Sequence, residues 1–250
     1  YSTNFESNND GWIIGDSTDN ATAGIWELAE PVATYNDQGN QVQPESDYSD
    51  NGTYCFITEN GTDSTVGNAG QSDVDGGKTT LYSPEFNLSD LDEAVVTYWR
   101  WYTNNVGDNG NNDKWIVSVK NNSSLWIDLE NTTASSNTWE KQRFILSDYI
   151  DLGESVQFRF VAEDLYYNGD SGSGGSLVEA AIDDFSIEYV GENSNILGDI
   201  NSDSYVDVLD VVIVVNMILS SENSNLAADL NDDGLINVQD VVTLIGIILQ

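Results

Sequence analysis

Side chains that carry oxygen recur at alternate positions in two segments near the C-terminal end of the chain, residues 199–210 and 229–240. Ca²⁺ is a hard cation bound by carboxylate, amide and carbonyl oxygens, and a tightly turning loop aims alternate residues at one ion. Positions 1, 3, 5, 7, 9 and 12 of each segment are therefore the predicted ligands, position 7 through its backbone carbonyl. They are Asp199, Asn201, Asp203, Tyr205, Asp207 and Asp210 in the first segment, and Asp229, Asn231, Asp233, Leu235, Asn237 and Asp240 in the second.

The two segments are copies of one pattern, offset by 30 residues. In a chain this rich in Asp and Asn, one such spacing could arise by chance. Two copies in the same register, each followed by an apolar stretch, argue against chance. Position 8 is aliphatic in both copies, Val206 and Ile236, where paired calcium loops bury a side chain. The repeat therefore predicts two Ca²⁺ ions in a small paired module.

An apolar stretch with helical character follows each segment, over residues 208–219 and 238–249. Both stretches are apolar nearly all the way round, and a module this small cannot bury them against each other alone. Two interpretations are open: a well-packed small core, or a surface that meets another protein, the neighbouring domain or a second copy of the chain. The residues predicted to dock are Val208, Leu209, Val212, Val215, Val238, Val242 and Ile245.

The repeat resembles the duplicated calcium segments of type I dockerins. The resemblance covers residues 197–250 and rests on the D-x-N-x-D start of each loop, on aspartate at position 12, and on the second copy. It implies a module that docks a secreted protein onto a cohesin-bearing scaffold. Ser204 departs from the family pattern, because glycine normally allows the sharp turn at position 6, and this implies a strained or weaker first loop. Positions 10 and 11 are Val208-Leu209 and Val238-Gln239, so no familiar cohesin specificity carries over.

The composition excludes several classes of function. The 250 residues include 43 acidic and 7 basic side chains and no histidine, which gives a formal charge of −36 at pH 7. Such a surface repels phosphate backbones and anionic membranes, so nucleic acid and phospholipid are excluded as partners. The lack of histidine excludes Ser-His-Asp triads and histidine-ligated zinc. No apolar run reaches the ~20 residues of a membrane span, so membrane insertion is excluded as well.

The start of the chain and its single cysteine bear on where the protein acts and on its redox chemistry. The chain starts at Tyr1 without a methionine, and we interpret it as a processed secreted or cell-surface chain, or as a piece of one. Cys55 is the single cysteine, so no internal disulfide forms, and we expect it to be a small buried hydrophobe.

Residues 1–190 consist of short alternating segments separated by Asn, Asp, Gly and Ser clusters. This pattern is typical of an antiparallel β-sandwich. The predicted strands span residues 25–28, 54–58, 79–82, 95–102, 115–119, 125–129, 142–146, 156–162 and 177–189. We therefore predict a mainly β protein with a β-sandwich over residues 1–190, a linker over 191–196 and a small α-helical calcium-binding domain over 197–250. The linker is too short for the two domains to swing freely.

Several stretches of the N-terminal region resemble a jelly-roll module of secreted bacterial peptidases, which is distantly similar to MAM and cleaved-adhesin domains. They are Phe5-Glu6, Gly11-Trp12, Ser83-Pro84 and residues 43–45, 73–81, 98–102, 113–115, 159–162 and 178–185. The resemblance implies an antiparallel jelly-roll β-sandwich in a secreted accessory domain.

Jelly rolls of this kind hold Ca²⁺ where the first strand meets the last. The resemblance therefore implies a third calcium site built from Glu6 with Asp183 or Asp184, helped by Asp73 or Asp75 of an Asp-Gly-Gly turn. A buried pair of carboxylates is costly without a cation or several N–H donors, which favours a site over a solvated strand end. Arg100 and Arg159 are alternative ion partners for the same carboxylates.

Two features leave alternatives open. In residues 95–102 alternation puts Trp99 and Trp101 on one face and Tyr98, Arg100 and Tyr102 on the other. Tryptophans form either sandwich core or a surface that stacks on sugar rings, and this applies to Trp99, Trp101, Trp115 and Trp126. Paired carboxylates such as Glu163 and Asp164 could hydrolyse a glycoside, but acidic pairs are so frequent in this chain that their presence decides nothing.

The resulting hypothesis is a secreted, non-catalytic, calcium-binding assembly or adhesion protein of bacterial type. In it, the dockerin-like module docks the β-sandwich onto a protein partner such as a cohesin-like domain. One alternative is a self-assembling subunit of an extracellular filament, in which the module packs on the neighbouring copy. Another is the accessory region of a secreted hydrolase, which binds a glycan or a protein.

Overall fold

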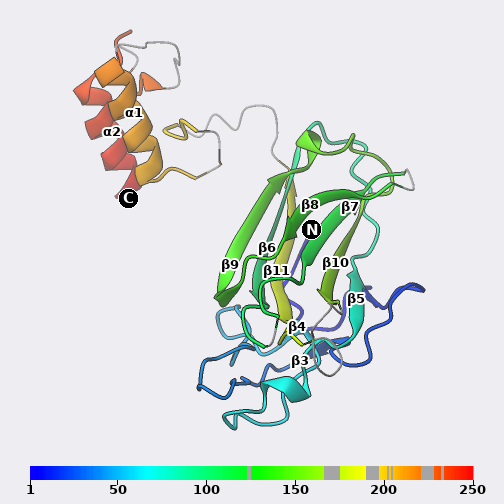
Figure 1. Cartoon of the computed structure of the whole chain (residues 1–250). Helices are drawn as coiled ribbons and strands as arrows, with labels where there is room; N and C mark the ends of the chain where they lie inside the picture. Colours follow the sequence, from blue (N-terminus) through cyan, green and yellow to red (C-terminus); the bar gives the residue numbers. More distant parts are fainter. Residues whose placement is uncertain are drawn as a thin grey trace. The chain divides into compact units, whose positions relative to one another are not determined.

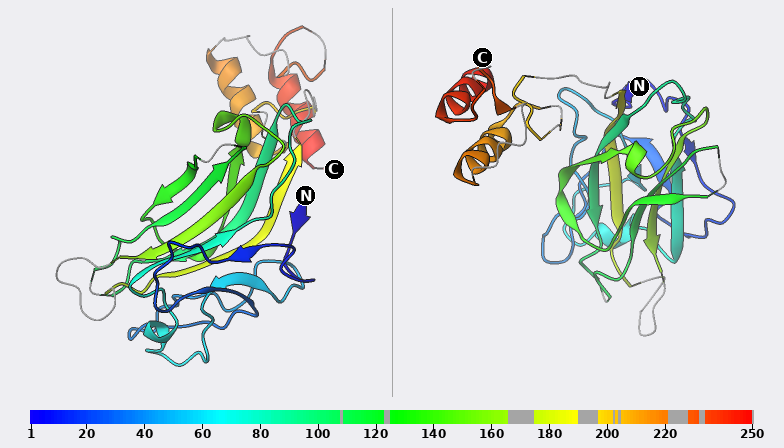
Figure 2. Two further views of the ribbon diagram at one scale, coloured as in Figure 1. Left: turned by 90° about the vertical axis from the view of Figure 1, so that its right-hand side faces the viewer. Right: turned by 90° about the horizontal axis from the view of Figure 1, so that it is seen from above.

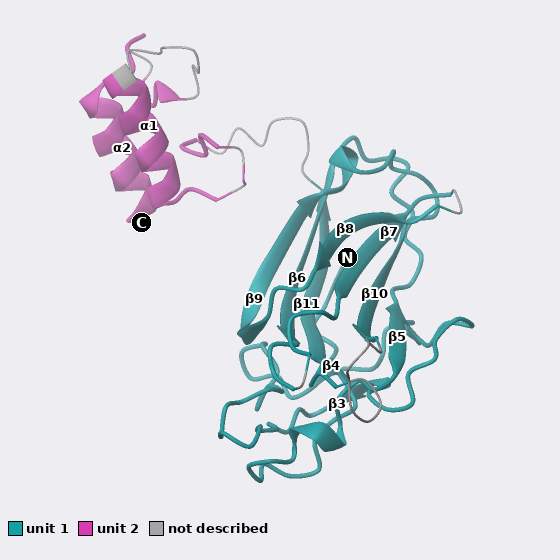
Figure 3. Cartoon of the chain, viewed as in Figure 1, with its two compact units in different colours: residues 1–189 teal, residues 190–250 magenta. Residues whose placement is uncertain are grey.

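The computed structural model describes residues 1–107, 109–122, 125–165, 175–189, 197–201, 203, 205–220, 228–231 and 234–249. The chain divides into two compact units, Tyr1–Tyr189 and Val190–Gln250 (Figure 1, Figure 3). The segment expected as a linker, residues 191–196, lies outside the described residues. Within the described part of the chain, no helix is long and apolar enough to cross a membrane.

Unit 1 consists of two antiparallel sheets that lie in two layers (Figure 2). Sheet A has the strand order β3 (Trp26–Ala29), β4 (Cys55–Thr58), β11 (Glu179–Tyr189), β6 (Ala94–Thr103) and β9 (Ser136–Ile145), with β1 (Ser2–Thr3) paired to β11. Sheet B has the order β2 (Ile13–Ile14), β5 (Gly77–Tyr82), β10 (Gln157–Asp164), β7 (Trp115–Lys120) and β8 (Ile127–Thr132). Two short 3₁₀ helices, η1 (Ala69–Gln71) and η2 (Leu146–Asp148), lie in the connections. The predicted mainly β fold, a jelly-roll-like antiparallel sandwich, is confirmed.

The side chains of β6 alternate between the two sides of sheet A, as predicted. Tyr98 and Tyr102 are fully buried in the main core between the sheets. Trp101 points to the opposite, outer side, where it packs with Cys55 and Ile57 in a second apolar cluster. Cys55 is fully buried, in agreement with its prediction as a small hydrophobe.

The loop over residues 42–48 covers this outer side of sheet A. The indole Nε1 of Trp101 donates a hydrogen bond to the carbonyl oxygen of Val42 at 2.7 Å. The ring of Tyr48 stacks on that of Trp99, with 3.6 Å between the centroids. Trp101 therefore belongs to a small second core, as the core alternative predicts, whereas Trp99 is half-buried and stacks on Tyr48.

The strand boundaries differ from the prediction mainly at the edges of the sheets. β9 begins at Ser136, ahead of the predicted start at Gln142. Its first half, Ser-Asn-Thr-Trp-Glu-Lys, is polar because β9 is an edge strand, where polar and charged residues prevent further pairing. The two-residue strands β1 and β2 were not predicted, because so short a segment carries no alternation to detect.

Unit 2 contains the two predicted helices, α1 (Val208–Ser220) and α2 (Val238–Ile248). They pack around a small core of Ile200, Val214, Ala228, Leu230 and Leu244. The position-8 residues Val206 and Ile236 pack against this core, as the loop pattern predicts.

Candidate calcium and docking sites

The position-12 aspartates Asp210 and Asp240 occupy the first turns of α1 and α2, and both are fully buried. The Oδ1 atom of Asp210 accepts hydrogen bonds from the backbone N–H groups of Ile200 and Asn201, at 2.8 and 3.2 Å. Its Oδ2 atom accepts one from the N–H group of Asp207 at 2.9 Å. A single carboxylate thus ties the start and the end of the first loop to its helix.

Asp240 closes the second loop in the same way. It accepts hydrogen bonds from the equivalent N–H groups, those of Leu230, Asn231 and Asn237, at 2.9, 3.3 and 2.8 Å. Gly234 at position 6 has a φ of 81°, the left-handed conformation that glycine adopts without strain. The structure therefore gives both copies the same closure.

The first-loop ligand oxygens point toward one another. The backbone N–H of Asp203 donates to the Oδ1 atoms of both Asp199 and Asn201, at 3.0 Å each. Oxygens of positions 1 and 3 therefore converge on the inside of the turn, where Ca²⁺ takes its ligands. The donor set of carboxylate, amide and carbonyl oxygens fits Ca²⁺ and suits neither zinc nor copper.

One predicted ligand, Asp233, lies outside the described residues, and so does Ser204, the departure from the family pattern at position 6. Among the described residues, no three Asp, Glu, His or Cys side chains are grouped as a metal site. The fit to Ca²⁺ rests on the donor chemistry and on the shared closure of the two loops.

The two helices carry exposed aliphatic side chains at equivalent positions. Val208, Val212 and Val215 on α1 have Val238, Val242 and Ile245 as counterparts on α2, 30 residues later, and Leu209 is exposed beside them. Four exposed apolar residues extend this set without having been predicted: Leu219 and Leu249 at the helix ends, and Tyr205 and Leu235 in the loops. The same 30-residue repeat could have revealed them. We call these eleven exposed residues the aliphatic stripe.

Residues 197–249 match the dockerin type I domain. The resemblance seen in the sequence is confirmed by this match. Dockerins bind calcium in general, which agrees with the oxygen donors of both loops.

In the β-sandwich, the structure brings three of the expected ligands together near the first and last strands. Asp183 on β11 is fully buried, and its Oδ2 atom accepts hydrogen bonds from the backbone N–H groups of Tyr48 and Ser49, at 2.9 and 3.2 Å. The Ser49 hydroxyl donates to Asp184 Oδ1 at 2.7 Å. Glu6 Oε1 accepts from the next part of the same loop, the N–H groups of residues 53 and 54, at 2.8 Å.

Asp47 is a fourth carboxylate of this site, and the sequence did not single it out. Its Oδ2 atom is buried and accepts no hydrogen bond from a described residue. Burial and the negative charges of Glu6 and Asp184 raise the pKa of Asp47. A Cβ at Gly52 would lie 2.0 Å from Asp47 Oδ2 and 3.0 Å from Glu6 Oε1, so glycine there lets the two carboxylates approach. Burial likewise raises the pKa of Asp183 to about 7.

These carboxylates are gathered around one loop, but they are not grouped as a formed metal site. We call Glu6, Asp47, Asp183 and Asp184 the first acidic cluster. Its orphaned Asp47 oxygen lacks the partner that a buried carboxylate needs, and a cation would supply it. Segment 45–50 contains three acidic residues at irregular spacing, so no sequence signal distinguishes Asp47 from its neighbours.

Asp75 lies elsewhere. Its backbone pairs with the segment before β3, through a hydrogen bond from Thr22 N–H to Asp75 carbonyl oxygen at 2.8 Å. Its charge acts on Asp73 and not on the first acidic cluster. The structure therefore assigns Asp73 and Asp75 to a different group of carboxylates from Glu6 and Asp183.

The two arginines considered as partners of the first acidic cluster have other partners. Arg100 is buried between Glu130 and Glu140, and its Nη2 atom lies 2.7 Å from Glu140 Oε2. Arg159 lies over the ring of Trp126, 4.6 Å from the centroid.

The acidic pair considered for catalysis does not form a shared site. Glu163 and Asp164 are neighbours on β10, so their side chains leave opposite faces of sheet B. Asp164 is fully buried, whereas Glu163 is half-buried beside Lys78 across the strand pair. A glycosidase needs both carboxylates on one cleft, and these two residues do not provide that arrangement.

Solved structures with a similar fold include several carbohydrate-binding modules. TmCBM61 in complex with β-1,4-galactotriose shares 14% identity, covers 74% of this chain and 94% of its own, and has a TM-score of 0.40. The xylan-binding CBM22-1 domain of Paenibacillus barcinonensis Xyn10C shares 12%, covers 77% and 95%, and has a TM-score of 0.40. The C-terminal family 22 module of Clostridium thermocellum Xyn10B shares 9%, covers 76% and 94%, and has a TM-score of 0.42. No curated protein matches the chain. Likenesses this low carry no conclusion about a ligand or a site of this chain.

Proposed function

We propose that this chain is a secreted, non-catalytic assembly protein whose dockerin module docks the β-sandwich onto a cohesin-like partner. Ca²⁺ in the two loops would hold α1 and α2 in place, and the first acidic cluster would hold a further Ca²⁺ in the sandwich. The observation that supports docking is the aliphatic stripe, which leaves eleven apolar side chains exposed on a unit of two helices.

A protein partner that covers the aliphatic stripe would explain why so many apolar side chains are exposed. Burying one Val, Leu or Ile side chain stabilises a complex by roughly 1.5–3 kcal/mol. Exposed apolar surface of this extent is typical of interaction sites.

A charge placed in the stripe tests the proposal. We expect Val212→Asp with Val242→Asp to weaken binding to a cohesin panel by about tenfold or more, since ~1.4 kcal/mol corresponds to a factor of ten. Calorimetry in calcium and in EDTA measures the affinity, and circular dichroism checks the helices. Val66→Asp is the matched control, because Val66 is as exposed at 57% but lies in the sandwich.

The same experiment distinguishes a cohesin partner from a second copy of this chain. Calcium-dependent self-association that the double variant abolishes, without binding to any cohesin, would replace the first proposal with the filament alternative. Sedimentation velocity at increasing concentration distinguishes the two. Unchanged binding in the double variant would remove the stripe from the interface altogether.

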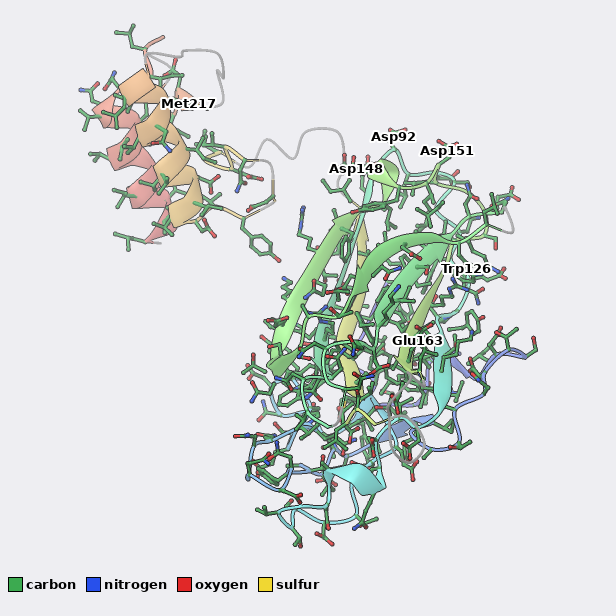
Figure 4. The ribbon with its side chains drawn as sticks, viewed as in Figure 1. Asp92, Trp126, Asp148, Asp151, Glu163 and Met217 are labelled. Carbon is green, nitrogen blue, oxygen red and sulfur yellow. The ribbon has the colours of Figure 1, made fainter. Side chains whose placement is uncertain are left out.

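A second candidate function is glycan binding on the outer face of sheet B. The ring of Trp126 is half-buried there, 5.8 Å from the ring of Tyr82, with Arg159 and Lys120 over it at 4.6 and 4.8 Å. In the strand register, Tyr82, Arg159 and Ser118 form one row across the face. Such a mixture of aromatic rings and hydrogen-bonding groups is suited to a sugar. Figure 4 labels Trp126 among the side chains of the sandwich.

The glycan proposal predicts that Trp126→Ala abolishes retardation in polysaccharide-containing native gels. Trp139→Ala is the control, because Trp139 lies on sheet A, where its Nε1 atom donates to the Ser46 carbonyl oxygen at 3.1 Å. Absence of retardation of the unmodified chain across a broad glycan panel would count against this function.

A further inference from the structure

A second group of carboxylates lies at the start of β11, on the outer side of sheet A. Glu179 has 0% of its surface exposed. Its Oε2 atom accepts hydrogen bonds from Gln43 Nε2 at 3.0 Å and from the Thr58 hydroxyl at 3.5 Å. Its Oε1 atom is equally buried and accepts no hydrogen bond from any described residue. One oxygen of a fully buried carboxylate therefore lacks a partner.

The nearest charges around Glu179 are negative. Asp73 is 4% exposed, and its charge together with that of Glu59 adds to the burial that raises the pKa of Glu179 far above its ordinary value. Burial and the charges of Asp75, Asp164 and Glu59 raise the pKa of Asp73 to about 8. The acidic groups thus penalise one another at short range.

No basic side chain compensates this charge. Every Lys and Arg of the chain belongs to the described residues, and the ion pairs between these residues join Lys78 to Asp19 and Arg100 to two glutamates of other strands. Neither Glu179 nor Asp73 has a basic partner in the described structure. A buried carboxylate without an opposite charge costs several kcal/mol, so a proton or a cation must neutralise the group.

The group is separate from the first acidic cluster. Glu179 and Asp183 lie on the same face of β11, four residues apart, which corresponds to about 13 Å along a strand. Ala181 lies between them and packs in the apolar cluster with Cys55 and Ile57. One ion cannot serve both places.

We propose that Glu179 and Asp73 are ligands of a divalent cation, Ca²⁺ by the chemistry of the donors, at a site distinct from the first acidic cluster. Two carboxylates would hold the ion, and water or backbone oxygen would fill the other positions, as Ca²⁺ tolerates. The backbone around it is already tightly packed: a Cβ at Gly24 would lie 2.2 Å from Val74 Cα, and Val74 N–H donates to the Val178 carbonyl oxygen at 2.9 Å. The ion would clamp the turn at residues 73–75 to the ends of β4 and β11.

Native mass spectrometry of the full chain in calcium tests this site, with dialysis against Mg²⁺ as a second arm to identify the ion. We expect Glu179→Gln to bind one Ca²⁺ fewer than the unmodified chain and to lose part of the calcium-dependent rise in the melting temperature of the sandwich. Glu188→Gln is the control, because Glu188 is exposed on the same strand and should leave the ion count unchanged. The glutamine keeps the shape of Glu179 and removes only its charge.

Asp73→Asn is the second variant, in case Glu179→Gln does not fold, and it should lose the same single ion. If both variants bind as many ions as the unmodified chain, a proton neutralises the pair and the proposal is overturned. If the site binds an ion after dialysis against Mg²⁺ but none in calcium, the assignment of the ion as Ca²⁺ is overturned. Neither result depends on docking, so this inference stands or fails separately from the proposed function.

Discussion

The buried carboxylates of this chain differ from one another in their hydrogen-bond partners and in their pKa, and these differences decide what each can do. Asp210 and Asp240 are buried, and each accepts three backbone hydrogen bonds. Asp183 is equally buried, but burial outweighs its hydrogen bonds and its pKa rises to about 7. Asp47 and Glu179 each keep one oxygen without a described partner. Buried carboxylates thus close loops in one unit and keep an oxygen without a described partner in the other.

The raised pKa of Asp183 predicts how stability depends on pH without calcium. A carboxyl whose folded pKa lies above its unfolded value of 3.8 stabilises the fold below that value, and this contribution is lost as pH rises toward about 7. At about 1.36 kcal/mol per pKa unit, the free energy of unfolding falls by roughly 4 kcal/mol across that window. Urea titrations in EDTA at a series of pH values measure it. Asp183→Asn should flatten the profile, and calcium should remove it, because the ion compensates the charged form.

At the scale of elements, the two loop–helix units of the dockerin module are closed by the same set of hydrogen bonds. In both, the position-12 carboxylate joins the N–H groups of positions 2, 3 and 9 to the first turn of its helix. The helices begin at Val208 and Val238, 30 residues apart, so closure and helix start shift together. The closure of each loop and the start of its helix therefore repeat together, with the same 30-residue offset as the aliphatic stripe.

This equivalence predicts that Asp210→Asn and Asp240→Asn have similar effects. An asparagine presents an N–H₂ group to at least one backbone N–H donor, which costs about 1–3 kcal/mol for the unsatisfied buried group, and it removes a ligand charge. Circular dichroism at 222 nm during calcium titration should show lower helicity and weaker calcium affinity for either variant. Asp151→Asn, at an exposed position of the sandwich, is the control and should change neither quantity. A large difference between the two loops would contradict their equivalence.

A feature of this chain could be predicted from the sequence when the residues that form it lie close together along the chain. The repeat could be predicted because its ligands and helices lie within 12 to 20 residues of one another along the chain. β6 could be predicted because alternation is local, and Trp101 and Tyr98 indeed face opposite sides. Glu179 and Asp47 could not, because Gln43 lies 136 residues from Glu179 and only the fold brings the two together. The loop over Trp99 was missed for the same reason.

At the scale of the whole molecule, the charge of −36 divides into two kinds. Seven aspartates are predicted ligands of the repeat, and the sandwich adds the first acidic cluster and the pair Glu179 and Asp73. Many of the remaining acidic residues, such as Asp92, Asp148 and Asp151, are exposed, and exposed charge of this kind favours solubility in a chain with an exposed aliphatic stripe. The two kinds should respond to different ions, because divalent cations would compensate the buried carboxylates, whereas any salt screens the exposed ones.

The division predicts that chelation and monovalent salt act differently on stability. Removing calcium with EDTA should lower the melting temperature of both units, because buried carboxylates then repel one another without compensation. Raising NaCl toward about 1 M shortens the screening length to ~3 Å and weakens only repulsion between exposed charges, so it should change the melting temperature little when calcium is present. Differential scanning calorimetry in calcium, in EDTA and after restoring excess calcium measures both effects on the same sample. Equal sensitivity to NaCl and to EDTA would mean that the charge acts as one diffuse surface field, and that ligand carboxylates are not a separate group.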